Sequence, residues 1–104
     1  MNSEVLILYT RKGCCLCKAL EEKFSDLCVE KLHPSIVLSI LDIDSNNVSF
    51  DIKMKYTNEV PVIVLDSKRL LKKIELPRVS PRLKEDMLLH WIQKHLNILY
   101  KMEI

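Results

Sequence analysis

The feature that most constrains this chain is a pair of cysteines, Cys14 and Cys17, separated by two residues. Residues 5–9, before the pair, form a short apolar run that is typical of a buried strand. Residues 16 to about 31 are amphipathic, which predicts a helix. We therefore expect the two cysteines at a junction between a strand and a helix, where Gly13 allows a close turn.

This junction favours a reactive Cys14. The first turn of a helix leaves backbone N–H groups without partners and carries the positive end of the helix dipole, and both stabilise a thiolate. Arg11, Lys12 and Lys18 add positive charge nearby. Cysteines in such surroundings ionise at a lower pH than a free thiol. We expect Cys14 to be exposed and nucleophilic, and Cys17 to be shielded one turn further on, ready to attack a mixed disulfide formed at Cys14.

Composition indicates one small globular domain, spanning residues 1–104, and excludes several other classes. The chain is 48% hydrophobic and 29% charged, which is ordinary for a domain with a single core. A net charge of +2 is too small to imply nucleic acid or an anionic membrane as a partner. No apolar run approaches the roughly 18 residues of a membrane-spanning helix, and no signal peptide is recognisable. The expected location is the cytoplasm, where four cysteines are not expected to form a disulfide framework.

The middle of the chain predicts a second strand and a second helix. Residues 36–43 are apolar on both faces, as in a parallel strand that is covered on both sides. Together with the first strand and helix they form a right-handed strand–helix–strand unit. A shorter helix is expected over about residues 48–56, after a polar turn.

The last third of the chain predicts a hairpin and a final helix. Residues 60–65 and 70–76 form the two strands of the hairpin, with Pro61 at the start of the first. Ser80 followed by Pro81 is typical of a helix N-terminus, so the last helix is expected to begin there. The apolar stripe of this helix is expected to consist of Leu83, Met87, Trp91 and Leu99.

Three parts of the sequence together resemble the glutaredoxins, and most closely the small glutaredoxin-like proteins of the thioredoxin fold. The resemblance covers nearly the whole chain in the right order. It implies an α/β fold of the order βαβ-α-ββα with a four-stranded mixed sheet of strand order 2-1-3-4. Strands 1 and 2 would be parallel, and the first and last helices would cover one face while the middle helix covers the other. The matching segments are Tyr9-Thr10-Arg11-Lys12-Gly13-Cys14-x-x-Cys17, Leu41-Asp42-Ile43-Asp44 with Tyr56, and Glu59-Val60-Pro61-Val62.

The resemblance also implies a site. Cys14 and Cys17 would be catalytic, and the bond between Val60 and Pro61 would be cis. The Val60 backbone could then pair with glutathione or an extended peptide as an added strand. The predicted substrate-binding residues are Arg11, Lys12, Val60 and Pro61, and no metal ligand is predicted.

The chain departs from the glutaredoxin pattern at two places. Cys15 and Leu16 stand where glutaredoxins usually carry a Pro-Tyr pair. The glycine-rich segment that grips a glutathione carboxylate in that family is replaced by residues 76–82, and no glycine follows Gly13. We hypothesise that the start of the last helix, with Arg78, receives a substrate carboxylate instead.

The expected function is that of a thiol–disulfide oxidoreductase that reduces protein or glutathione mixed disulfides. No bound cofactor is expected, glutathione is a candidate co-substrate, and the protein is expected to be a monomer. One alternative is an iron–sulfur or metal-binding thiol protein in which Cys14 of two chains shares a cluster. Another is a non-catalytic interaction module. Cys28 is expected to be a core residue of the first helix, and Cys15 a small residue in the place of proline.

Overall fold

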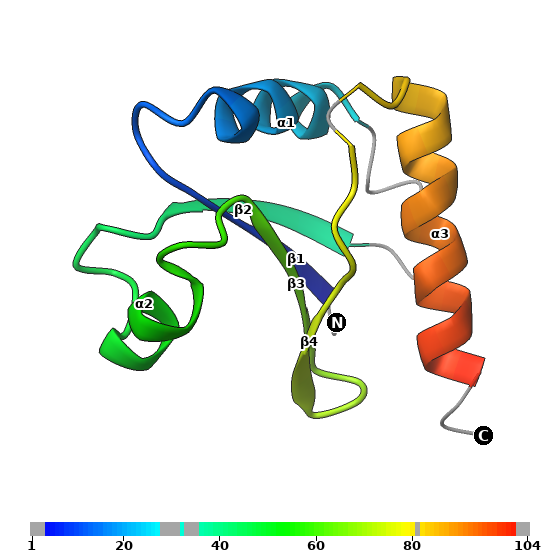
Figure 1. The fold of residues 1–104 in the computed structure, drawn as a ribbon. Helices are drawn as coiled ribbons and strands as arrows, with labels where there is room; N and C mark the ends of the chain where they lie inside the picture. Colours follow the sequence, from blue (N-terminus) through cyan, green and yellow to red (C-terminus); the bar gives the residue numbers. More distant parts are fainter. Residues whose placement is uncertain (1–3, 28–31, 33–35, 81, 102–104) are drawn as a thin grey trace.

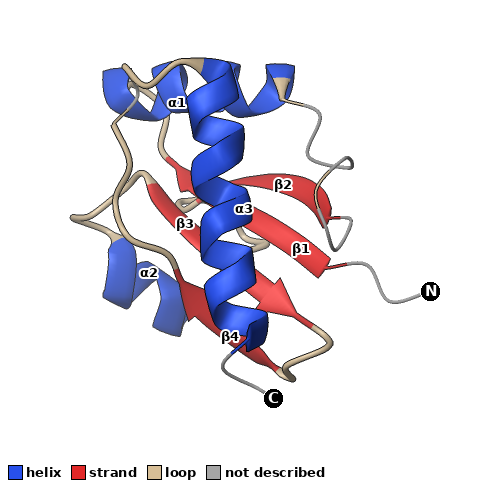
Figure 2. Cartoon of the chain, turned by 90° about the vertical axis from the view of Figure 1, so that its right-hand side faces the viewer, coloured by secondary structure: helices blue, strands red, loops and turns tan. Residues whose placement is uncertain are grey.

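A computed structural model of the protein describes residues 4–27, 32, 36–80 and 82–101. Within these residues a four-stranded sheet lies between helices (Figures 1 and 2). The strand order is β2-β1-β3-β4, with β1 parallel to β2 and antiparallel to β3, and β3 antiparallel to β4, which confirms the predicted mixed sheet. The elements are β1 (Glu4–Thr10), α1 (Cys15–Asp26), β2 (Ile36–Asp42), α2 (Phe50–Tyr56), β3 (Val62–Ser67), β4 (Lys72–Glu75) and α3 (Glu85–Lys101).

The central strand β1 separates two cores. Leu6 and Leu8 point to one face of the sheet, where they pack with side chains of α1 and α3. Ile7 and Tyr9 point to the opposite face, where they pack with Tyr56 of α2. The ring centroids of the two tyrosines lie 5.8 Å apart. Because both faces of β1 are covered, a continuous apolar run suits the strand, and the predicted distribution of helices is confirmed.

The first two helices are shorter than the sequence predicted. α1 ends at Asp26, because Leu27 adopts an extended conformation and its N–H donates to the Phe24 carbonyl at 3.2 Å. α1 therefore ends before residue 27, and the rest of the predicted continuation, residues 28–31 with Cys28, lies outside the described residues. α2 begins at Phe50 rather than near residue 48, since the Ser49 hydroxyl accepts the Ile52 N–H at 3.3 Å as an N-cap.

The predicted start of the last helix at Ser80 is also wrong, and Pro81 lies outside the described residues. The Ser80 hydroxyl accepts the Arg82 N–H at 3.2 Å, and the Ser80 carbonyl accepts the Leu83 N–H at 3.1 Å. These bonds close a turn instead of a helix. α3 begins at Glu85. The acidic residues in its first turn interact favourably with the positive end of the helix dipole.

The buried stripe of α3 is displaced by one position from the predicted one. Leu88, Ile92 and Leu96 are fully buried, whereas Met87 is exposed. Leu83 precedes the helix, and Trp91 and Leu99 pack only at the edge of the core. The predicted residues therefore flank the buried face rather than form it.

Both strands of the hairpin begin two residues later than predicted; β3 extends to Ser67 and keeps its predicted length, whereas β4 is shorter. Leu71 has a φ of 56°, a left-handed conformation that a strand cannot contain, so β4 begins at Lys72 and not at residue 70. β3 begins at Val62 rather than residue 60, directly after the bond between Val60 and Pro61. This bond is cis, as the resemblance implied.

A buried carboxylate ties three elements together at the amino end of β1. Glu4 is only 1% exposed, and its carboxylate accepts the Tyr100 hydroxyl of α3 and, at 3.1 Å, the Arg69 N–H of the β3–β4 turn. The Ser67 side chain also hydrogen-bonds this carboxyl. Burial raises the pKa of Glu4, but the hydrogen bonds outweigh burial and hold the pKa below its ordinary value.

We expect Glu4→Gln to lower the free energy of unfolding by about 1–3 kcal/mol at pH 7, because it leaves buried groups with mismatched partners. A depressed native pKa stabilises the fold above the unfolded-state pKa of the residue, and this contribution is lost as pH falls through the native pKa. Urea unfolding at several pH values should therefore show that the difference in free energy of unfolding between wild type and Glu4→Gln becomes smaller in acid. Glu22→Gln, at an exposed position of α1, is the control. A difference in free energy of unfolding that does not change with pH would contradict this role of the Glu4 carboxylate.

Candidate active site

Cys14 is the N-cap of α1. Its backbone is extended, with φ −90° and ψ 110°, and its sulfur accepts the Cys17 backbone N–H at 3.2 Å. This N–H is one of the groups that a helix N-terminus leaves without an intrahelical partner. The geometry directs a backbone donor and the positive end of the helix at the Cys14 sulfur, and both favour a thiolate there.

The two cysteines of the pair differ in exposure. Cys17 is 1% exposed, whereas Cys14 is half-buried and lies at the end of the helix. Their Cα atoms are 5.2 Å apart, within the usual range for a disulfide, and the two sulfurs are bonded to each other. Cys15 is exposed, and its thiol is free. A partner molecule can therefore approach Cys14 or Cys15 directly. Buried Cys17 can exchange only with the Cys14 sulfur, to which it is bonded.

Arg11 links the turn before α1 to the end of α2. Its guanidinium donates to the Asp44 carboxylate at 2.9 and 3.1 Å. It also donates to the Thr57 carbonyl and the Thr57 hydroxyl, both at 2.7 Å. The hydrogen bond between the two charged groups raises the pKa of Arg11 and lowers that of Asp44. The structure thus gives Arg11 a bracing contact, and its contact with substrate stays a prediction.

The sequence contains a signal for this brace, because the two residues follow neighbouring strands. Thr10 and Asp42 are opposite each other in the parallel pair of β1 and β2. Residues that follow two parallel strands emerge at the same edge of the sheet, so Arg11 and Asp44 are natural neighbours. Once the two strands are predicted to be parallel, this ion pair could have been predicted as well.

A shallow depression of about 740 Å³ lies on one side of Cys14. It is lined by Cys14 and Cys15, by basic residues of the turn and of α1 that include exposed Lys12, and by three acidic residues of α1. The structure thus brings Lys12 and Cys14 into one surface, as predicted from their closeness in sequence. The remaining basic residues of this surface are Arg11 and Lys18.

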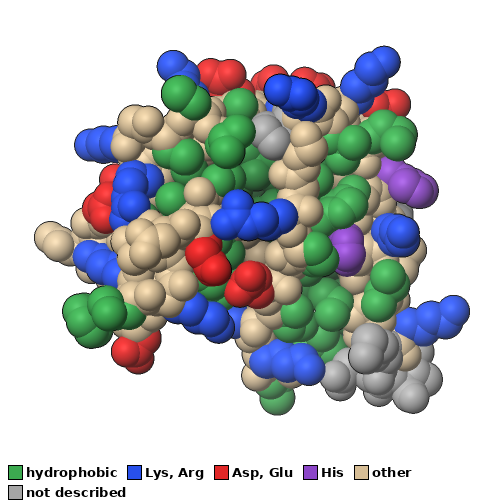
Figure 3. Space-filling view, in the orientation of Figure 1, with side chains coloured by type: hydrophobic (Ala, Val, Ile, Leu, Met, Phe, Trp, Pro, Cys, Tyr) green, Lys and Arg blue, Asp and Glu red, His purple; other side chains and the backbone are tan. Residues whose placement is uncertain are grey.

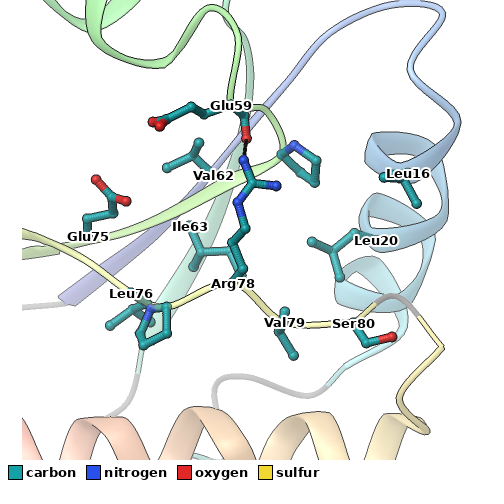
Figure 4. Close-up of a pocket in the computed structure, with 12 residues that line it drawn as sticks. Leu16, Leu20, Glu59, Val62, Ile63, Glu75, Leu76, Arg78, Val79 and Ser80 are labelled. Carbon is teal, nitrogen blue, oxygen red and sulfur yellow. Dashed lines mark hydrogen bonds between the residues drawn. The ribbon is translucent and has the colours of Figure 1, made fainter.

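A separate groove of about 350 Å³ lies on the other side of α1 (Figure 4). Leu16, which stands between the two cysteines of the pair, lines this groove together with Pro61. Val60 is half-buried and packs against the core on the α2 side. Figure 3 shows apolar side chains gathered on this face below α1, with acidic and basic side chains among them. The remaining walls are formed by Leu20, residues 62–63 of β3, Glu59 and residues 75–80.

Among the described residues, no three His, Cys, Asp or Glu side chains are grouped so that they could hold a metal ion. No helix in the same part of the chain is long and apolar enough to cross a membrane.

The sheet order, the helices on its two faces and the Cys-x-x-Cys pair before α1 define a thioredoxin-like fold. Residues 5–93 match the family model described as "Glutaredoxin-like domain", and the chain belongs to this family. No curated protein matches the chain significantly.

Several solved structures share the fold. A structure described only as that of a malarial protein has a TM-score of 0.59 and 22% identity, covering 91% of this chain and 99% of that one. Thioredoxin-2, a component of the protein secretion machinery of the malaria parasite, has a TM-score of 0.59 and 21% identity over 90% and 84% of the two chains. The germline-specific thioredoxin Deadhead of Drosophila melanogaster has a TM-score of 0.58 and 16% identity over 89% and 81%. At these identities the likeness concerns the fold alone.

We expect Arg11→Lys to lower the thermal unfolding midpoint, because an ammonium cannot reproduce the paired donors that contact Asp44 and Thr57. Lys18→Arg, a swap that also keeps the charge but lies at an exposed helical position, should leave the midpoint unchanged. Circular dichroism melts of the three proteins test this prediction. Equal midpoints for wild type and Arg11→Lys would show that the brace contributes nothing to stability.

Proposed function

We propose that the protein is a thiol–disulfide oxidoreductase in which Cys14 is the nucleophile and Cys17 the resolving thiol. One observation carries the proposal: the half-buried Cys14 sulfur accepts a helix N-terminal N–H and also lies within bonding reach of buried Cys17. The first contact supports a thiolate at Cys14. The second supports resolution within the same chain rather than by an external thiol.

The proposed reaction has two exchange steps. The Cys14 thiolate attacks one sulfur of the substrate disulfide, so that the substrate S–S bond breaks and a mixed disulfide forms. The released substrate sulfur leaves as a thiolate and takes a proton from solvent. Cys17 then loses its proton and attacks the Cys14 sulfur, which releases the second substrate thiolate. The substrate gains two electrons, and the protein is left with a disulfide between Cys14 and Cys17.

The surroundings of Cys14 supply the other proposed roles. Lys12 and the α1 dipole stabilise the thiolate, and Arg11 braces the turn that carries it. Val60 and Pro61 position the substrate, a role supported by the groove that Pro61 lines together with Leu16. No bound cofactor is required, because the exchanging sulfurs carry the electrons.

The proposed substrates are disulfide-bearing proteins or glutathione mixed disulfides. A cellular thiol must reopen the bond between Cys14 and Cys17 after each turnover, and glutathione is the candidate co-substrate. We propose a monomer that acts in the cytoplasm, where such reducing thiols are abundant.

We expect Cys14→Ser to abolish the reduction of glutathione disulfide and of a cysteine-containing peptide disulfide. Cys17→Ser should instead accumulate a mixed disulfide at Cys14, because the proposed resolving thiol is missing. Mass analysis of acid-quenched reactions measures both outcomes. Cys15→Ser is the matched control and should retain wild-type turnover. Loss of activity in Cys15→Ser with retention in Cys14→Ser would contradict the assigned roles.

A further inference from the structure

Arg11 and Cys14 are the first and last residues of one tight turn. The Cys14 N–H donates to the Arg11 carbonyl at 3.3 Å, and Gly13, the third residue of the turn, has a φ of 81°. A four-residue turn that is closed in this way ties the backbones of its two ends together. A displacement of Arg11 therefore moves Cys14 as well.

The side chain of Arg11 is bonded to two elements outside this turn. Figure 1 shows the turn, the loop after β2 and the helix α2 on one side of the molecule. Hydrogen bonds of 2.7 to 3.1 Å join the guanidinium to Asp44, in the loop after β2, and to Thr57, the C-cap of α2. Asp44 is held as well, because its N–H donates to the Asp42 carboxylate at 2.9 Å. These contacts of Arg11 with Asp44 and Thr57 form the brace of the turn.

The brace matters most when the cysteine pair is reduced. In the disulfide form, Cys14 is also held by its covalent bond to buried Cys17. Reduction removes this bond, and the Cys14 sulfur then depends on the turn and on the Cys17 N–H, which lies 3.2 Å from it, to keep its place. The stabilisation of a thiolate by a helix N-terminus falls off within the first turn of the helix, so a small displacement of the sulfur weakens it.

We propose that Arg11 is a positioning residue for the nucleophile: by holding the turn against Asp44 and Thr57, it keeps the reduced Cys14 sulfur at the N-terminus of α1. The inference rests on the proposed function and deepens it, because it makes the reactivity of Cys14 depend on a helix end that lies 46 residues from Arg11. The Asp44 carboxylate offsets the charge of the guanidinium, so Arg11 acts through its position rather than through its charge.

The two ends of α2 provide a matched comparison. The Thr57 hydroxyl accepts an Arg11 N–H at 2.7 Å, whereas the Ser49 hydroxyl, at the opposite end of the helix, accepts the Ile52 N–H at 3.3 Å. Thr57→Val and Ser49→Ala each remove one hydroxyl hydrogen bond and no charge. Because only Thr57→Val weakens the brace, the comparison separates the brace from a general loosening of α2.

The test measures the pKa of Cys14 in the reduced protein. All proteins carry Cys15→Ser, so that the neighbouring exposed thiol does not react. Each is alkylated with iodoacetamide over a range of pH, and peptide mapping by mass spectrometry gives the rate of labelling at Cys14. The Cys15→Ser parent is compared with Thr57→Val, Thr57→Ser, Arg11→Lys and Ser49→Ala. Circular dichroism confirms that each protein is folded at the assay temperature.

We expect Thr57→Val and Arg11→Lys to raise the pKa of Cys14, because both weaken the hold on the turn without removing a charge. At a pH below this pKa, labelling of Cys14 should be roughly threefold slower than in the parent, in proportion to the smaller thiolate fraction. Thr57→Ser keeps the hydroxyl and should label like the parent. Ser49→Ala should do so as well.

The inference alone is overturned by an unchanged or lowered pKa of Cys14 in either Thr57→Val or Arg11→Lys. An equal rise in Ser49→Ala or in Thr57→Ser would also overturn it, since it would indicate a general loosening of α2. A parent protein that reduces neither glutathione disulfide nor the peptide disulfide, and whose Cys14 titrates like a free thiol, would overturn the proposed function, and the inference with it.

Discussion

Burial of β1 on both faces is the constraint on which the rest of the structure depends. Leu6 and Leu8 belong to the core beneath α1 and α3, while Ile7 and Tyr9 belong to the core beneath α2. A shift of the strand by one residue would exchange these two sets of side chains, so the register cannot slip. The end of β1 is thereby fixed, and with it the turn that places Cys14 at the start of α1.

Two arginines hold the site together from opposite sides. Arg11, in the turn before α1, reaches Thr57, and Arg78, after β4, reaches Glu59. Both contacts fall on the short connection between α2 and β3, directly before the cis bond of Pro61. This connection is thus clamped between the cysteine turn and the groove wall by bonds from charged donors. At the amino end of β1, away from the site, the Glu4 carboxylate joins the strand to α3 and to the β3–β4 turn.

Much of the fold and the centre of the site could be predicted from the sequence. The apolar run of residues 5–9, Gly13 and the two cysteines specify a strand, a close turn and a helix N-terminus through neighbours in the chain. The sheet order and the cis bond followed from the resemblance that these residues and Pro61 carry. Element ends were predicted less well: Ser80 has the side chain of a helix cap, but its hydroxyl and carbonyl close a turn instead.

By itself, the sequence determined that residues 6–9 lie in a buried strand and that Cys14 stands where a helix begins, because both depend on residues close together in the chain. The tertiary structure alone decided the partners of the two arginines. Asp44 lies 33 residues from Arg11, and Glu59 lies 19 residues from Arg78. A guanidinium can serve many acceptors, and the pairing of strands and the path of the chain after β4 bring one of them within reach.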